Sequence, residues 1–261
     1  MDLSDFKANF FGVKMQEIHS KKKQRFVVGI TGASGIRLGI RFAGHLARFA
    51  ENSEIFVVFS NGAKMVAQYE EKISDILSDS HIKSLLDLGK SSGDSCVKSA
   101  TDSNESRKDS YNLQGDLSKS SAKITLCDDS ALDSPISSGS FGVSATVIIP
   151  CSANTLAKIA CGISETLITR AALVALKERK TLLLAPREIP LNAIMLQNML
   201  NLTNMGAIIA PPMLSYYTNS KNLADMEDFM CGKWLDSINV AHNLFPRWGE
   251  NTSESNADKS K

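Results

Sequence analysis

An arginine and a glutamate stand between two prolines at one point of this chain. The stretch APREIP covers residues 185–190 and follows three leucines at 182–184. Proline fixes its own backbone angle and stops helices, so this loop can hold two charges in a defined geometry. Arg187 can make a two-pronged contact with a phosphate, and Glu188 can donate or accept a proton. The pair predicts a ligand site where a buried strand ends.

A glycine-rich turn follows the first apolar run of the sequence. The segment ITGASGIRLG covers residues 30–39, in which Gly32 and Gly35 permit a tight turn and a close backbone approach. Ser34 adds a hydroxyl, and the helix that follows starts with its amides free, as in a phosphate-binding turn. A plain connection between a strand and a helix remains an alternative, and the motif alone does not identify the ligand.

A second polar cluster stands in IPCSANTLAKIACG, residues 149–162. Ser152, Asn154 and Thr155 lie at the start of a predicted helix, where capping residues belong. Their density also predicts a second contact with a polar ligand. Cys151 precedes them, and because no histidine is near it in sequence to activate its thiol, we interpret it as a packing residue.

Two cations on the next predicted helix extend this polar set. Arg170 and Lys177 are seven residues apart in ETLITRAALVALKERK, residues 165–180, and so share one helix face. Such a pair can grip a phosphate, and a solvated helix face is equally compatible with the spacing.

Six short apolar runs alternate with helical patterns along the chain. This alternation predicts an α/β fold with a parallel sheet, right-handed crossovers and helices on both faces. In such a sheet, ligands bind beyond the carboxyl ends of the strands. The predicted strands cover residues 26–30, 54–59, 124–127, 145–149, 181–185 and 207–209, and the predicted helices residues 36–50, 61–71, 154–161, 166–178, 193–205 and 222–238.

The chain is expected to form a single domain over residues 25–250, with a flexible extension over 1–24 and a flexible tail over 251–261. Residues 89–123 interrupt it with ten serines among 35 residues and few apolar side chains. Such a segment cannot bury enough surface to offset the chain entropy lost on ordering. We therefore predict a disordered insertion there.

The composition excludes several classes of protein. Hydrophobic residues make up 43% of the 261 residues, and the net charge of +1 gives no sign of a nucleic-acid or membrane-surface binder. No apolar run approaches the roughly 20 residues of a membrane helix. The five cysteines show no CxxC spacing and the four histidines no zinc pattern, so we expect free thiols, no metal and a cytoplasmic protein.

A dinucleotide-binding reductase of the short-chain kind is one alternative. Its fingerprint resembles the turn at residues 31–39, and Tyr217 and Lys221 have the Tyr-xxx-Lys spacing of that class. However, Tyr217 follows two prolines in the loop-like stretch YYTNSK. Ser60 and Asn61, after the second strand, supply no acid to hold an adenosine ribose. We therefore disfavour this alternative.

Taken together, the motifs resemble those of one family, the flavin prenyltransferases. At least five separate motifs occur in the family's order, and the resemblance covers residues 26–78 and 124–250. The motifs are TGASG (31–35), ISSGSF (136–141), IIPCSANTLAKIACG (148–162), LITRAALVALKERKTLLLAPREIPL (167–191), NMLNLTNMGAIIAPP (198–212), YY (216–217) and PRWGE (246–250).

The resemblance implies a flavodoxin-like Rossmann sheet, assembled into trimers and then a dodecamer with sites at subunit interfaces. It implies that the protein binds FMN and joins to it a dimethylallyl group, taken from dimethylallyl monophosphate or diphosphate. The new ring spans the N5 and C6 atoms of the flavin, and the prenylated FMN serves a partner decarboxylase of the ubiquinone or aromatic-acid type. The family requires no metal.

The resemblance also implies roles for individual residues. Glu70 and Glu188 match two acids of the active site. From the charges of the reaction we expect Glu188 to donate a proton to the leaving phosphate, and Glu70, with Ser34 as relay, to handle the proton lost on ring closure. Trp248 matches the aromatic residue that covers the site. The group around the prenyl phosphate is matched by Arg170, Lys177, Tyr217 and Lys233. The flavin contacts are matched by Gly32, Ala33, Ser34, Ser60, Ser138, Gly139, Ser152, Ala153, Asn154, Thr155 and Arg187.

Two positions depart from the family pattern, and two other functions remain open. Lys233 stands where arginine is frequent and so lacks the fork geometry of arginine, and Leu38 stands where an aromatic residue is frequent.

The first rival function is that of an FMN-dependent cysteine decarboxylase, which shares the sheet but relies on a histidine base after the second helix. This sequence offers only His81 there. The second rival is a catalytically silent FMN-binding subunit.

Overall fold

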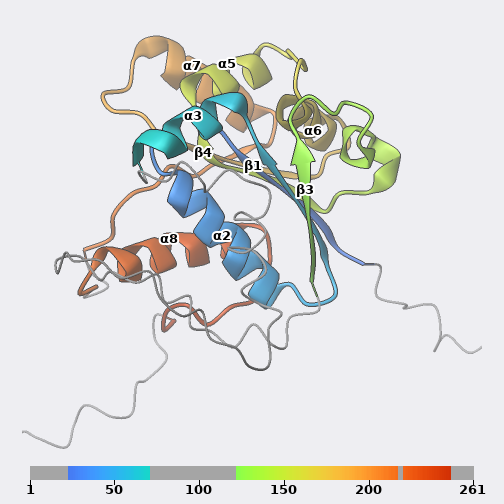
Figure 1. The fold of residues 1–261 in the computed structure, drawn as a ribbon. Helices are drawn as coiled ribbons and strands as arrows, with labels where there is room; N and C mark the ends of the chain where they lie inside the picture. The colour runs from blue at the N-terminus through green and yellow to red at the C-terminus, as the bar shows by residue number, and fades with distance from the viewer. Residues whose placement is uncertain (1–22, 71–121, 217–219, 248–261) are drawn as a thin grey trace, which may run out of the picture.

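The structure is a computed structural model that describes residues 23–70, 122–216 and 220–247. It contains a six-stranded sheet in the order β3-β2-β1-β4-β5-β6, in which every pair of neighbouring strands is parallel (Figure 1). The strands are β1 (Arg25–Ile30), β2 (Glu54–Phe59), β3 (Lys123–Asp128), β4 (Ala145–Cys151), β5 (Thr181–Pro186) and β6 (Ile208–Ile209). The predicted α/β fold with a parallel sheet is confirmed.

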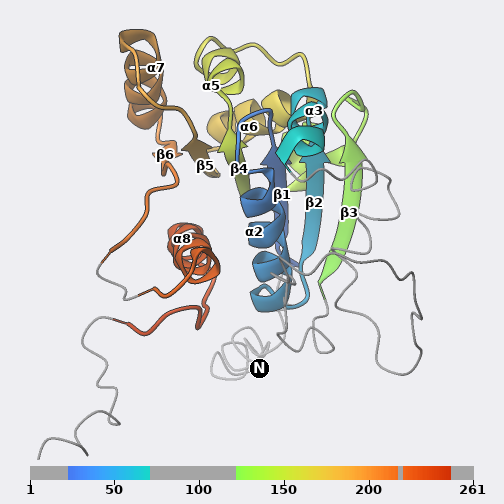
Figure 2. The same ribbon diagram turned by 60° about the vertical axis from the view of Figure 1, so that its left-hand side comes forward.

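Helices cover both faces of the sheet, as predicted. Figure 2 shows α2 and α8 on one side and α6 on the other, with α3 and α5 near the edge where the strands end. The helices are α2 (Ile36–Phe49), α3 (Asn61–Glu70), α5 (Ala153–Ala160), α6 (Leu167–Lys177), α7 (Ala193–Asn204) and α8 (Leu223–Ser237), with the 3-10 turns η2 (Pro135–Ser137) and η3 (Gly139–Phe141) before β4.

Most boundaries differ by one residue from the expected ones. The largest difference is in strand β4, which continues two residues further, through Pro150 to Cys151, and strand β3 already begins at Lys123, the last residue assigned to the insertion. The rest of that insertion, and the expected terminal extension and tail over 1–22 and 251–261, lie outside the described residues. None of the described helices is long and apolar enough to cross a membrane.

The sheet separates two apolar clusters, and their burial supplies the main driving force for this packing. One cluster joins the inner faces of α2, α3 and α8 to the sheet, with Phe42 and Trp234 in edge-to-face contact at 6.1 Å between ring centroids. The other joins α5, α6 and α7 to the opposite face, where Leu167 and Leu184 are fully buried. Each strand of the central sheet therefore contributes alternate side chains to two cores.

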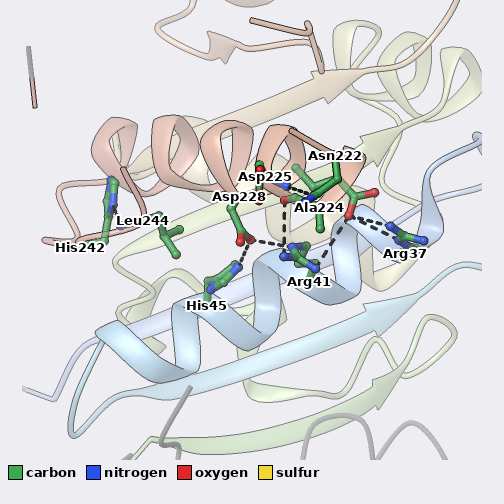
Figure 3. Close-up of polar contacts among 10 residues, drawn as sticks. Arg37, Arg41, His45, Asn222, Ala224, Asp225, Asp228, His242 and Leu244 are labelled. Atoms are coloured by element: carbon green, nitrogen blue, oxygen red, sulfur yellow. Dashed lines mark hydrogen bonds and ion pairs between the residues drawn. The ribbon is translucent and has the colours of Figure 1, made fainter. Parts of the chain in front are cut away.

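Helix α8 is held on α2 by charged side chains (Figure 3). Asp228 accepts from Arg41 Nε at 2.6 Å and lies 2.6 Å from His45 Nε2, and Glu227 pairs with Arg37 at 3.1 Å. Burial would raise the pKa of the Asp228 carboxyl, but its bonds to His45 and Arg41 outweigh burial and lower that pKa to about 2. These pairs fix how α8 lies along α2.

The packing of α2 on β4 generates a stability prediction. A Cβ atom at Gly39 would overlap the carbonyl oxygen of Ile149, whereas one at Gly44 of the same helix would meet nothing within 4 Å. We expect Gly39→Ala to lower the free energy of unfolding by about 1–3 kcal/mol, as overpacking does. Gly44→Ala should leave it unchanged or raise it by up to about 1 kcal/mol. Urea unfolding of both variants measures this, and equal effects would contradict the close packing.

Candidate functional site

A cavity of about 650 Å³ lies at the carboxyl ends of the strands. Its walls come from the segments that follow β1, β2, β3, β4 and β5 and from the first turns of α5 and α6. The cavity brings together ten of the residues predicted for the site, from four separate segments. They are Gly32, Ala33, Ser34, Ser60, Ser152, Ala153, Asn154, Thr155, Arg187 and Glu188.

The turn after β1 is tied to the end of β4. Thr31 donates its hydroxyl to the carbonyl oxygen of Pro150 at 2.9 Å and accepts from the amide of Ser152 at 2.7 Å. The same turn lies against the start of α3, because a Cβ atom at Gly32 would be 2.8 Å from the carbonyl carbon of Gly62. Only glycine permits this approach, so the turn forms one continuous wall with the ends of β1 and β4.

The start of α2 differs from the prediction. Its amides were expected to be free, but the carboxylate of Glu70 occupies two of them. Its oxygens accept from the amide of Gly35 at 2.9 and 3.1 Å and from that of Ile36 at 3.2 Å. Gly35 has no side chain that could cap the helix, so an acid from the end of α3 takes that role. Glu70 therefore stands beside the turn that carries Ser34, although it does not line the cavity.

The start of α5 combines capping with exposure to the cavity. Ser152 accepts from the amide of Thr155 at 3.2 Å and donates to its hydroxyl at 3.0 Å, so the capping interpretation is confirmed. Among the described residues, the amides of Ala153 and Asn154 have no acceptor, and both residues line the cavity. Arg187 also lines the cavity, so these amides and this cation suit an anion, whereas Lys158 is paired with Glu165 at 2.6 Å.

The APREIP loop forms the rim of the cavity. Arg187 donates its backbone amide to the carbonyl oxygen of Cys151 at 3.2 Å, which fixes the loop against the end of β4. Both Arg187 and Glu188 are exposed and line the cavity. Glu188 accepts from the amide of Ile189 at 3.1 Å, which leaves its carboxyl group at the open side of the site.

Four predicted residues, Arg170, Lys177, Ser138 and Gly139, lie outside this cavity in a second part of the chain. Arg170 donates to the carbonyl oxygen of Ser137 at 3.0 Å, and Lys177 pairs with Glu178. A Cβ atom at Gly139 would lie 2.8 Å from Lys177 Nζ, so η3 rests on the end of α6. Arg170 and Lys177 do share one helix face, as predicted, and that face contacts Ser137 and Gly139 and not the cavity.

The remaining predicted residues lie elsewhere. Lys233 is exposed on α8 and does not line the cavity. Leu38 is buried in the core between α2 and the sheet. Tyr217 and Trp248 lie outside the described residues, as does His81. Within the described ranges, no three His, Cys, Asp or Glu residues are grouped so that they could hold a metal ion.

Sequence reasoning missed several residues of the cavity wall. Asp129, Thr166 and Thr169 come from the end of β3 and the start of α6, and Asn61 and Lys158 from α3 and α5. The pair Asp128-Asp129 directly follows the third predicted strand, so the rule that selected residues after the other strands would have found it. Thr166 and Thr169 form a capping box, which is visible in sequence only as two threonines three residues apart.

Cys151 generates a prediction about reactivity. It is fully buried, and this burial raises the pKa of its thiol to about 12, so almost no thiolate exists near neutral pH. Cys161, by contrast, is exposed. We expect iodoacetamide to alkylate Cys161 in the native protein while Cys151 reacts only after denaturation. Peptide mass spectrometry measures the alkylation of each cysteine, with Cys161→Ser as the control. Labelling of Cys151 in the native protein would contradict its role in packing.

Comparison with known proteins identifies the family of the chain. The family model described as Flavoprotein matches residues 14–232. The flavin prenyltransferase UbiX of Helicobacter pylori strain J99 is 40% identical over 227 residues, which are 87% of this chain and 100% of the relative. The flavin prenyltransferase UbiX of Thermoplasma acidophilum is 40% identical over 224 residues, 86% of this chain and 99% of that protein.

Solved structures show the same similarity. The crystal structure of AnUbiX (PadA1) in complex with FMN and dimethylallyl pyrophosphate has a TM-score of 0.67 and 32% identity, and covers 87% of this chain and 98% of the other. A dodecameric FMN-dependent UbiX-like decarboxylase from Escherichia coli O157:H7 has a TM-score of 0.66 and 30% identity, and covers 86% of this chain and 99% of the other. This chain therefore belongs to the flavin prenyltransferase family.

Proposed function

We propose that this protein joins a dimethylallyl group to the N5 and C6 atoms of reduced FMN and so makes prenylated FMN for a partner decarboxylase. The observation that supports this most directly is the cavity at the strand ends, where Arg187 and Glu188 stand at the rim of a wall rich in hydroxyls. The relative AnUbiX was crystallised with FMN and dimethylallyl pyrophosphate, and its fold covers 87% of this chain. A monophosphate and a diphosphate donor are both compatible with the site.

The cavity fits an elongated flavin nucleotide. Arg187 follows β5 and Asp129 follows β3, and these strands are four places apart in the sheet, a span of about 19 Å. The free amides of α5, with Arg187, suit the phosphate of FMN. The hydroxyls of Ser34, Ser60 and Thr155 suit the rest of the molecule. When bound, FMN supplies the nucleophilic N5 atom, and the chain positions it.

The cations proposed for the prenyl phosphate come from neighbouring subunits. Arg170 and Lys177 do not line the cavity of their own chain, and Lys233 is exposed on α8. Since the similar protein of E. coli is dodecameric, we assign these side chains, with Tyr217, to the cavity of an adjacent copy. There each would stabilise the departing phosphate by roughly 3 kcal/mol, a typical electrostatic contribution to a transition state.

Two acids are assigned to proton transfer. Glu188 stands at the rim beside Arg187 and is proposed to protonate the leaving phosphate. Glu70 accepts hydrogen bonds from the two amides that follow Ser34. Closing the new ring on the flavin releases a proton, and we assign its removal to Glu70 with Ser34 as relay. Trp248 is proposed to cover the site and keep water from the allylic cation.

Three further expectations accompany this function. The protein is proposed to act in the cytoplasm, which agrees with the four free cysteines among its described residues. Residues 25–250 are proposed to be one FMN-binding domain. A homo-oligomer built from trimers is expected, because the site needs side chains that one copy does not bring to its own cavity.

Incubation of the protein with reduced FMN and dimethylallyl monophosphate tests the proposed reaction. We expect mass spectrometry to show a flavin heavier by one C5 unit. A bound flavin without this product would favour the silent subunit, and release of carbon dioxide from a peptidyl cysteine would favour the decarboxylase. Loss of product when dimethylallyl monophosphate is withheld is the control for the donor.

Glu188→Gln tests the proton donor. The amide cannot give up a proton to the phosphate, so turnover should fall by about 100-fold or more while FMN still binds. Glu51→Gln is the matched control, because Glu51 is exposed just before β2, at the amino ends of the strands and away from the cavity. Full activity of Glu188→Gln would remove this residue from the mechanism.

Mixed oligomers test whether the site is shared between copies. Arg170→Ala and Glu188→Gln should each be nearly inactive alone. Co-expressed subunits should regain about a quarter of wild-type activity, since a quarter of the randomly mixed sites receive both intact side chains. If mixing restores nothing, both residues act within one chain, and the assignment of Arg170 to the neighbouring cavity is wrong.

A further inference from the structure

Asp129 is a buried acid in the cavity wall to which neither the sequence motifs nor the proposed reaction assigns a role. It directly follows β3, and its side of the cavity lies at the other end of the strand order from Arg187. Only 9% of its surface is exposed, and that surface borders the cavity. Carboxyl groups are rarely so buried without donors around them.

Part of this carboxyl group is used to hold α6. Asp129 Oδ1 accepts from the amide of Ile168 at 2.9 Å, and the backbone oxygen of Asp129 accepts from the amide of Leu167 at 2.7 Å. The amide of Thr169 is taken by the hydroxyl of Thr166 at 3.4 Å. The first turn of α6 therefore has no amide left for an anion, and what it presents to the cavity is an acid and hydroxyls.

The Asp129 carboxylate can accept further hydrogen bonds. Burial raises the pKa of this carboxyl, the amide of Ile168 and the Thr166 side chain lower it, neighbouring Asp128 raises it and Lys64 of α3 lowers it. A carboxylate can accept about four hydrogen bonds, and Ile168 and Thr166 supply two donors. A ligand that fills the cavity excludes water from the remaining positions, so it must supply a donor itself or force the carboxyl to take up a proton.

We propose that Asp129 is a flavin-binding residue that accepts a hydrogen bond from a neutral donor of the flavin, either a ribityl hydroxyl or the imide N–H of the ring. Like charge keeps the flavin phosphate away from this acid, and the free amides of α5 with Arg187 offer it a better place. The two ends of the cavity thus set the direction in which the flavin enters. This inference rests on the proposed function, because it takes the flavin as the occupant.

Flavin binding by Asp129→Asn tests the proposal. Asparagine keeps an oxygen for the amide of Ile168, so α6 should stay in place while the charged acceptor is lost. We expect Kd for FMN and for riboflavin to rise by about 10-fold or more. Asp133→Asn is the matched control, since Asp133 is an exposed acid of the same segment, and it should bind like the wild type. If Asp129→Asn binds both flavins within two-fold of this control, the proposal is wrong.

Lumiflavin, which lacks the ribityl chain, distinguishes the two donors. A loss of affinity that persists with lumiflavin assigns the bond to the imide N–H, and one that disappears assigns it to a ribityl hydroxyl. Circular dichroism and thermal unfolding monitor the fold. Should Asp129→Asn fail to fold, Asp129→Ser also keeps an acceptor for the helix and allows the same comparison.

The pH dependence of riboflavin binding gives a second readout, free of the titration of the FMN phosphate. The ionised carboxylate is the better acceptor, so wild-type affinity should fall as pH is lowered through the raised pKa of Asp129, and the profile of Asp129→Asn should stay flat. Identical profiles, or proton uptake by the wild type on binding, would overturn the proposal. A wild type that binds flavin yet makes no prenylated product would refute the proposed function alone.

Discussion

The close approach of the first turn to the ends of two other segments is the constraint on which this site depends. Thr31 joins β1 to β4 through one donated and one accepted hydrogen bond, and Gly32 lies against the backbone of Gly62. A few residues later, Gly39 lets α2 lie on the carbonyl oxygen of Ile149. Without these contacts, the ends of β1, β2 and β4 would not form one wall, and the hydroxyls they carry would not face a common ligand.

The distribution of helix ends determines the polarity of the cavity. Four helices start near it, and each could offer its amides to an anion. Glu70 occupies two amides of α2, Ser60 accepts from the amide of Ala63 in α3, and Asp129 with Thr166 occupies the amides of α6. At α5, the amides of Ala153 and Asn154 have no acceptor among the described residues. The helix starts look equivalent in sequence, but their different capping makes the two ends of the cavity different. One end suits an anion, and the other suits a hydrogen-bond donor. This polarity can orient an elongated ligand before any chemistry takes place.

Three of the cations proposed for the prenyl phosphate lie outside the cavity of their own chain. Arg170 and Lys177 face η2 and η3, which are packed on α6, and Lys233 lies on a helix held to α2 by charged pairs. In the proposed oligomer, a neighbouring copy would receive these side chains, and assembly would then complete the phosphate site.

The sequence by itself determined the order and type of the elements, because the alternation of short apolar runs with helical periods appears in every segment that the structure describes. It also identified the hydroxyls after β1 and β4 and the Arg187-Glu188 pair, since all of them follow a strand directly. The tertiary structure alone decided that Glu70 caps α2 and that Arg170 contacts η2 and not the cavity. The physical reason is that a backbone amide can donate a hydrogen bond to any carboxylate that reaches it. Which acid arrives depends on contacts between residues far apart in the chain.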